Sequence, residues 1–422
     1  MLFFLPLGTR YIFLPGNIAG ADVEWGTVSL FVTQLLAAAF VAAVFAVRVR
    51  EISWAKSWPA AVLSAAILMS VMRADDLLRA FATNGWWLFL GLLVWCAVRL
   101  LRPASRGVLV ALSASAALQS LLAALQFGFQ EVWGSRWLGV SPQSALIAGT
   151  SVVEAADGRW LRAYGTLPHP NVLGIYCAVG LTMALWLVLR GKGQRLRRLA
   201  AVSLPVITLG LVLSFSRSAW LGAAFGLTAV LVSSLRRSSP KRKTVAVAAL
   251  AVMVSTVVGA VAVLPGPFLS RVTATGRLES ASISERISSV EDAKVLLARR
   301  PFFGVGPGQM PYATANQQPD RSGWSYQPVH LLPVIIGVEV GLVGLAAWAL
   351  WLLWPCSAAF LRSRRCRWLP GPGSVGLIVM LVAGLFDHYA WTLWPGAVLF
   401  FILAGLEASA SDRCGKVARE HK

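Results

Sequence analysis

The sequence predicts an all-α, polytopic membrane protein, a helical bundle with about twelve transmembrane helices. Composition is the first reason, because 57% of the 422 residues are hydrophobic and only 13% are charged. A water-soluble domain carries about a quarter charged residues, so this composition excludes a soluble enzyme. The second reason is that apolar residues occur in runs of roughly 16 to 24, the length that spans a bilayer as a helix.

We expect residues 1–422 to form a single integral membrane domain. Its first predicted span is the weakest, because Pro6, Arg10 and Pro15 interrupt it. That stretch also lacks the basic n-region and cleavage site of a removed signal peptide. The predicted spans lie near residues 2–16, 27–47, 57–72, 86–98, 107–128, 171–189, 199–215, 218–235, 244–265, 331–354, 373–386 and 391–406.

Charge decides which ends of the spans face the cytoplasm. With a cytoplasmic N-terminus and C-terminus, the inner segments hold 24 of the 38 basic residues and only four of the 18 acidic ones. The rest of the chain is neutral, so the whole net charge of +20 is cytoplasmic. This is the positive-inside bias of membrane proteins rather than a nucleic-acid footprint, and we expect no nucleic-acid partner.

Two outer connections are long, while all the inner ones are short. Residues 129–170 form an outer loop, and residues 266–330 form a larger one with helix-like stretches. Loops of this length in a compact protein are usually functional or disordered, and the aromatic residues in both favour order. We therefore expect the working face to be periplasmic or extracellular, with part of the site in the larger loop.

Residues 282–300 read as a loop helix. Ser282 and Glu285 have capping-box spacing, and Pro301 ends the segment. Arg286 lies at the centre of an apolar stripe that contains Val290, Ala293 and Leu297, with Ser288, Glu291 and Asp292 on the other side. A buried cation needs a partner, so Arg286 snorkels outward, pairs with Glu285 or binds an anionic ligand.

Three more groups on the outer face are candidates for chemistry. Arg217 lies at an outer junction between two spans, against the charge bias, where it snorkels or binds an anion. His330 ends the larger loop, and its imidazole can accept a proton near neutral pH. His169, next to a proline, is typical of a loop-shaping residue; His388 is a rival base, and Glu339 is an ionisable residue inside a span.

The outer acids do not predict a metal site. Asp75-Asp76 and Glu291-Asp292 are adjacent pairs, whose side chains diverge by about 100° on a helix. No zinc or nucleotide-binding motif occurs either, so we expect no metal and no cofactor. Arginines would then carry the charge of any phosphate group, which suits their bidentate geometry.

Four stretches of this chain resemble the O-antigen ligase and O-antigen polymerase-like membrane glycosyltransferases. The order of the stretches, the large outer loop and the number of spans are also similar to that family. The family often has asparagine after the histidine, where this chain has Leu331. The stretches are Arg162-Ala-Tyr-Gly-Thr-Leu-Pro-His169-Pro-Asn171, Ser214-Phe-Ser-Arg217-Ser-Ala-Trp220, Glu285-Arg286 with Pro301-Phe-Phe-Gly304-Val-Gly306-Pro-Gly308, and Pro328-Val-His330 with Glu339-Val-Gly341-Leu-Val-Gly344.

The resemblance implies a GT-C-like fold in a bacterial inner (cytoplasmic) membrane and an enzyme of lipopolysaccharide or other cell-envelope polysaccharide biosynthesis. Such an enzyme transfers a glycan from a polyprenyl (undecaprenyl) diphosphate carrier to lipid A–core or another glycan acceptor at the outer leaflet. The reaction is metal-independent and inverts the anomeric centre. By the same resemblance, Arg217 and Arg286 bind the donor diphosphate, His330 activates the acceptor hydroxyl, and Arg162 and His169 are further substrate-binding residues.

The motifs leave two alternatives open. A ligase makes one transfer to a surface acceptor, whereas a Wzy-like polymerase uses a second lipid-linked repeat unit as acceptor. A solute or bicarbonate transporter is the alternative from another class, and it would show internal repeats and binding residues near the membrane midplane. We find no convincing repeat, and the candidate cations lie at the outer surface, which favours the enzyme.

Overall fold

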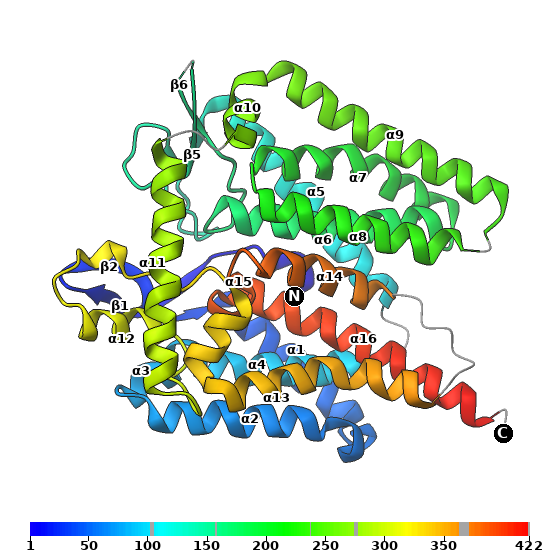
Figure 1. Ribbon diagram of the computed structural model, residues 1–422. Coiled ribbons are helices and arrows are strands. Elements are labelled where there is room, and N and C mark those ends of the chain that lie inside the picture. Colours follow the sequence, from blue (N-terminus) through cyan, green and yellow to red (C-terminus); the bar gives the residue numbers. More distant parts are fainter. Residues whose placement is uncertain (102–104, 157, 237, 274–276, 363–370, 421–422) are drawn as a thin grey trace. The chain divides into compact units, whose positions relative to one another are not determined.

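A computed structural model describes residues 1–101, 105–156, 158–236, 238–273, 277–362 and 371–420 (Figure 1). Some basic residues counted above lie outside these ranges, namely Arg102, Arg237, Arg364, Arg365, Arg367 and Lys422. The described chain is mainly helical, which confirms the all-α prediction, and its strands are confined to three two-stranded hairpins.

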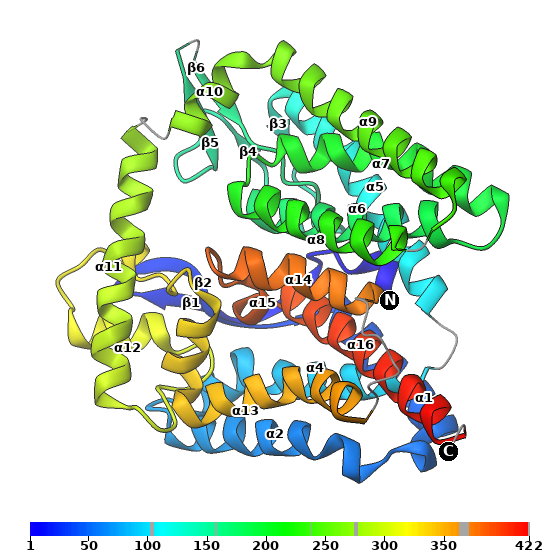
Figure 2. The ribbon, with the colours of Figure 1, turned by 45° about the vertical axis from the view of Figure 1, so that its right-hand side comes forward.

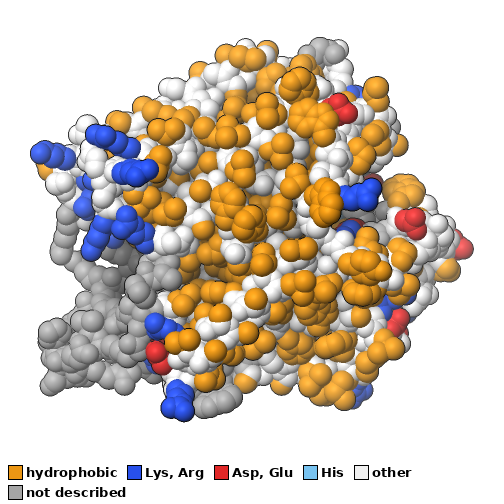
Figure 3. Space-filling view, turned by 180° about the vertical axis from the view of Figure 1, so that it is seen from behind, with side chains coloured by type: hydrophobic (Ala, Val, Ile, Leu, Met, Phe, Trp, Pro, Cys, Tyr) orange, Lys and Arg blue, Asp and Glu red, His pale blue; other side chains and the backbone are white. Residues whose placement is uncertain are grey.

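Ten helices within the described residues are long and apolar enough to cross a membrane. They correspond to ten of the twelve predicted spans, so the chain is a multi-pass membrane protein. Hydrophobic side chains cover most of the face shown in Figure 3, as expected for helices that face lipid. The ten helices are α1 (Val32–Arg48), α2 (Trp54–Arg73), α4 (Trp86–Leu100), α5 (Ser105–Phe129), α6 (Pro170–Arg190), α7 (Gln194–Leu213), α8 (Arg217–Leu235), α9 (Pro240–Val263), α13 (Leu332–Arg362) and α16 (Trp394–Glu420).

The predicted span over residues 2–16 is wrong. These residues form a short 3-10 helix (Leu2–Phe4) and most of strand β1 (Arg10–Ile18), which pairs antiparallel with β2 (Ala21–Phe31). Pro6 and Pro15 each remove a backbone donor, which disfavours a continuous helix there. The predicted span over 373–386 corresponds to α14 (Pro372–Gly384), whose 13 residues are about 20 Å long, shorter than a bilayer core.

The shorter elements lie between the long helices. Helix α11 begins at Arg277, five residues before the predicted Ser282, so the helix is confirmed but Ser282 is not its cap. The shorter helices are α3 (Leu77–Ala80), a π-helical turn (Phe81–Gly85), α10 (Pro265–Thr273), α11 (Arg277–Arg299), α12 (Met310–Gln317), α15 (Tyr389–Thr392) and 3-10 turns at Val49–Glu51 and Gly323–Ser325; the remaining strands are β3 (Glu131–Val132), β4 (Gln143–Ser144), β5 (Val152–Ala155) and β6 (Gly158–Leu161).

The chain divides into two compact units. The first comprises residues 1–9, 103–282 and 369–383, and the second comprises residues 10–102, 283–368 and 384–422. In the first unit, α6 lies among α5, α7 and α8 (Figure 1) and is buried along almost its whole length. Small residues allow this close packing, because a Cβ on Gly180 would lie 2.2 Å from the Cβ of Ala116.

In the second unit, α13 packs against α2, and α16 packs against α4 and α13 (Figure 2). Helix α13 is kinked at Gly341, whose φ is +72°. A loop of the same unit fills the kink: the amides of Val305 and Gly306 donate to the carbonyls of Val338 and Glu339, at 3.0 and 2.9 Å. The amide of Leu342 in turn donates to the Pro301 carbonyl at 2.7 Å. The loop therefore satisfies backbone groups that the kink removes from the helical ladder.

The backbone conformation at the kink requires glycine at position 341. Its φ is left-handed, and an added Cβ would lie 2.1 Å from the Phe302 carbonyl oxygen. We expect Gly341→Ala to destabilise the protein by about 1–3 kcal/mol or more, from backbone strain and the clash. Thermal unfolding in detergent measures this. The control is Gly259→Ala in α9, where nothing lies within 4 Å of the added Cβ; equal melting temperatures for the two variants would contradict the prediction.

Candidate functional site

In the first unit, a tight turn between α7 and α8 positions Arg217. Phe215 in this turn is fully buried and has a left-handed φ of +47°, a conformation that is strained for a residue with a side chain. The hydroxyl of Ser216 accepts a hydrogen bond from the Ala219 amide and caps α8. Arg217 is thus the first residue of α8, where the unpaired amides of the helix N-terminus add to its positive charge. This end of α8 favours an anion.

Two other arginines of the same unit hold the turn. Nε of Arg162 donates to the Ser214 carbonyl at 2.8 Å, and Nε of Arg271 donates to the Phe215 carbonyl at 3.0 Å. Arg162 also donates to the side-chain oxygen of Asn171 and is buried. These contacts give Arg162 the geometry of a residue that fixes the turn before Arg217. The sequence alone does not identify Arg271, because its partner Phe215 lies 56 positions away and no local pattern indicates that contact.

His169 caps α6. Its Nδ1 accepts a hydrogen bond from the Asn171 amide at 3.1 Å, and its Nε2 lies 3.0 Å from the Ser151 hydroxyl. Since Asn171 also accepts from Arg162, the N-terminal ends of α6 and α8 are joined through one polar network. The first unit therefore brings Arg162, His169 and Arg217 to adjoining helix ends, with the first two engaged in local structure.

In the second unit, His330 lies two residues before the start of α13. Its ring contacts that of His388, with the centroids 4.7 Å apart and the planes at 77°. Nδ1 of His330 is buried and has no hydrogen-bond partner among the described residues. Burial and, to a smaller extent, the positive charge of Arg286 together lower the pKa of His330 to about 4. The ring is therefore neutral at physiological pH, with a lone pair available.

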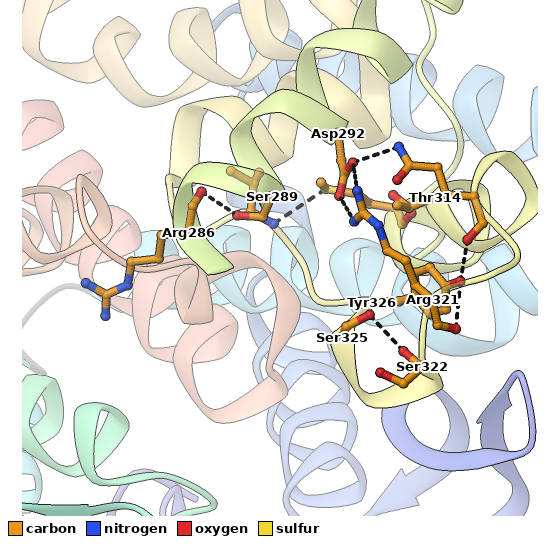
Figure 4. Close-up of polar contacts among 11 residues, drawn as sticks. Arg286, Ser289, Asp292, Thr314, Arg321, Ser322, Ser325 and Tyr326 are labelled. Atoms are coloured by element: carbon orange, nitrogen blue, oxygen red, sulfur yellow. Dashed lines mark hydrogen bonds and ion pairs between the residues drawn. The ribbon is translucent and has the colours of Figure 1, made fainter. Parts of the chain in front are cut away.

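Arg286 of α11 is near enough to His330 for its charge to affect the pKa of that histidine. Within the described chain its guanidinium makes no hydrogen bond or ion pair, and no bridge to Glu285 forms; its carbonyl accepts from the Ser289 hydroxyl. Figure 4 shows that the Arg286 side chain points away from the polar cluster on the other side of α11. Ala293 and Leu296 are buried on this helix, which agrees with an apolar docking face.

The polar cluster fixes α11 to the loop that leads to His330. Both oxygens of Asp292 accept from the guanidinium of Arg321, at 2.7 and 3.1 Å, and Gln318 donates to Asp292 as well (Figure 4). Asp292 thus lies on the side of α11 away from Arg286, as predicted, and it is buried and ion-paired there. The pair fixes this side of α11, while Arg286 points from the other side and stays available to a ligand.

The glycine-rich stretch Gly304-Val-Gly306-Pro-Gly308 uses backbone amides to bind α13, so these amides are not free to bind a phosphate. A helix does follow it, because α12 begins at Met310, but the amides of Val305 and Gly306 are used by the kink. Glu339 lies beside this kink, and its carboxylate accepts from Nε1 of Trp391 at 2.8 Å. Among the described residues, no group of three or more histidine, cysteine, aspartate or glutamate side chains could hold a metal ion.

The electrostatic coupling between Arg286 and His330 can be tested directly. We expect Arg286→Gln to raise the pKa of His330, because the variant removes a positive charge that disfavours the imidazolium. Carbon and nitrogen NMR of histidine-labelled protein measures this, since the chain has only four histidines. Arg299→Gln on the exposed end of α11 is the control and leaves the pKa unchanged. An unchanged His330 titration in Arg286→Gln would show that the two groups are not coupled.

Comparison with known proteins adds the family. Residues 202–349, about a third of the chain, match the family model Wzy_C, described as O-antigen ligase. This segment contains Arg217, Arg286 and His330, whereas Arg162, His169 and His388 lie outside it. No curated protein matches the chain. The chain is therefore a multi-pass membrane protein whose residues 202–349 are similar to the O-antigen ligase family.

Proposed function

We propose that the chain transfers a glycan from a polyprenyl (undecaprenyl) diphosphate carrier to a glycan acceptor, as an O-antigen ligase does. One observation carries the proposal. The buried Nδ1 of the neutral His330 ring has no partner, and the ring lies in the electric field of the Arg286 guanidinium, which no described protein group neutralises. A base and an unpaired cation are the two groups that glycosyl transfer from a diphosphate needs.

The proposed reaction is one displacement at the anomeric carbon. His330 accepts the proton of an acceptor hydroxyl, whose oxygen then attacks that carbon from the face opposite the diphosphate. The bond between the anomeric carbon and the diphosphate oxygen breaks, and the polyprenyl diphosphate leaves with the electron pair. Inversion follows from attack opposite the leaving group. No step requires a metal, because arginines stabilise the negative charge that develops on the diphosphate.

The two cations have different supports in this proposal. Arg286 is held by α11, which the Asp292–Arg321 pair anchors. Arg217 is held by a turn whose carbonyls are bound by Arg162 and Arg271. We therefore assign Arg162 and His169 to the positioning of the donor site rather than to direct contact with the donor. The acceptor is lipid A–core or another glycan, and lipid surrounds the helices.

The proposed active face is the outer one. With the span over residues 2–16 removed, the same charge bias places the N-terminus and the β1–β2 hairpin outside, while the C-terminus stays cytoplasmic. Helix α14 must then cross the membrane despite its length. Under this topology, Arg217, Arg286 and His330 all lie on the periplasmic or extracellular side of a bacterial inner membrane.

Loss of either cation is expected to stop transfer. Arg217→Ala and Arg286→Ala should each lower the rate by about 10²–10³-fold, the usual effect of removing one charge-stabilising donor. The assay uses purified protein in nanodiscs with EDTA, a polyprenyl-diphosphate glycan and a lipid-linked acceptor. Exposed arginines provide matched controls, Arg136→Ala for the first unit and Arg299→Ala on α11. Normal transfer by either cation variant would refute the diphosphate-binding role of that residue.

The sizes of the products separate ligase from polymerase. A single transfer that persists in EDTA supports the proposed metal-independent ligase, whereas a ladder of repeats identifies a polymerase. Loss of transfer in EDTA that added Mg²⁺ restores would refute the metal-independent mechanism.

The topology is tested by cysteine labelling in a cysteine-free background. Asp22→Cys in the β1–β2 hairpin should react with a membrane-impermeant maleimide applied to spheroplasts, because this residue is exposed and lies on the proposed outer side. Lys192→Cys, exposed between α6 and α7, should react only after lysis. The opposite pattern of labelling would invert the proposed topology and place the site in the cytoplasm.

A further inference from the structure

His388 directly precedes α15 and is 1% exposed. Three aromatic rings of the second unit surround it: His330, Trp25 of β2 and Tyr389, at centroid distances of 4.7, 5.3 and 4.7 Å. All three contacts are edge-to-face. Nδ1 of His330 has no hydrogen-bond partner within the described chain, so this atom makes no bond to the His388 ring. The edge-to-face contact between the two rings is a packing contact.

The ring of His388 is itself fixed by local hydrogen bonds. Its Nδ1 is hydrogen-bonded to the Thr392 hydroxyl, and its backbone amide donates to the Asp387 carboxylate at 2.8 Å. The carbonyl of His388 accepts from the amides of Trp391 and Thr392, at 2.9 and 3.2 Å. Both the backbone and the ring of His388 thus have one defined orientation.

A side-chain bridge joins this turn to α13, the helix that follows His330. Nε1 of Trp391 donates to Glu339 at 2.8 Å, both groups are buried, and Glu339 lies in α13 nine residues after His330. The contacts form a closed ring: His330 leads into α13, Glu339 binds Trp391, Trp391 belongs to α15, and His388 at the start of α15 contacts His330. Two restraints therefore act on His330: its backbone leads into α13, and its imidazole packs against His388.

We propose that His388 is a positioning residue for His330: it packs against the imidazole, excludes water from it and fixes its orientation toward the acceptor. This inference rests on the proposed function for its role in transfer. The charged and titratable groups that face His330 are Arg286 from α11 and His388 from the turn before α15. Asp387 binds the His388 amide, Glu339 is turned to Trp391, and β2 contributes the uncharged Trp25.

Two substitutions separate packing from chemistry. His388→Phe keeps a flat ring of similar size, whereas His388→Ala admits water to His330. We expect His388→Ala to raise the pKa of His330 from about 4 toward the ordinary value near 6.5. Transfer by His388→Ala should then fall about tenfold between pH 7.5 and pH 5.5, because a base of pKa near 6.5 is mostly protonated at the lower pH. Wild type and His388→Phe should change little over that range.

The titration of His330 is followed by histidine NMR, which needs no turnover, beside the pH profile of kcat. Thr392→Val removes the hydroxyl that orients His388 and should raise the pKa of His330 by a smaller amount. This variant also keeps the inference testable if His388→Ala does not fold. Glu291→Gln, on the exposed side of α11, is the control and should leave the titration unchanged.

Two results would overturn the inference. An unchanged His330 titration in both His388→Ala and Thr392→Val would show that His388 does not control the environment of His330. Transfer that survives His330→Ala but is abolished by His388→Phe would make His388 the base itself. Transfer that survives His330→Ala alone refutes the proposed base, while the NMR titration still decides whether His388 shields His330.

Discussion

The second unit depends on the break in α13 at Gly341. A span inside lipid cannot leave backbone groups without partners, so a kinked span needs a second segment that supplies hydrogen bonds. The loop over residues 301–306 does this by pairing with Val338, Glu339 and Leu342. Its path requires Gly304, since a Cβ there would lie 2.4 Å from the Val338 carbonyl oxygen. The conformation of the loop over residues 301–306 is thus tied to α13, the helix that follows His330.

The first unit solves a related problem with side chains. The turn before Arg217 is strained at Phe215, and its carbonyls are bound by charged donors from residues far away in the sequence. Hydrogen bonds from charged donors are stronger than those from neutral donors, and burial makes them stronger still, so the turn resists rearrangement. In both units, therefore, an irregular stretch of backbone is held by hydrogen bonds from distant residues: the turn before Arg217 in the first unit and the kink of α13, the helix that follows His330, in the second.

Local patterns predicted most of the fold, and for physical reasons. Long apolar runs specify spans because burial in lipid is nearly independent of which helix is the neighbour. Residues 2–16 mislead because the run is apolar but contains Pro6 and Pro15, and much of it pairs as strand β1 with β2, the segment that directly precedes α1. Arg217, Arg286 and His330 could be selected because each breaks its local pattern. The contacts that orient these residues could not be predicted, because they join distant positions. His388 contacts His330 across 58 positions, and Arg271 binds Phe215 across 56.

In the proposed mechanism, the charge of the bound donor changes the proton affinity of His330. In the free protein the field of Arg286 and burial both disfavour a proton on His330, which keeps the ring neutral but makes it a weak base. A bound diphosphate would offset the charge of Arg286 and so raise the proton affinity of His330. The base becomes stronger only when the leaving group is present. In the empty protein a stronger base would be protonated more often and unable to accept the hydroxyl proton. The low pKa of His330 is therefore compatible with its proposed role, because the substrate itself supplies the missing negative charge.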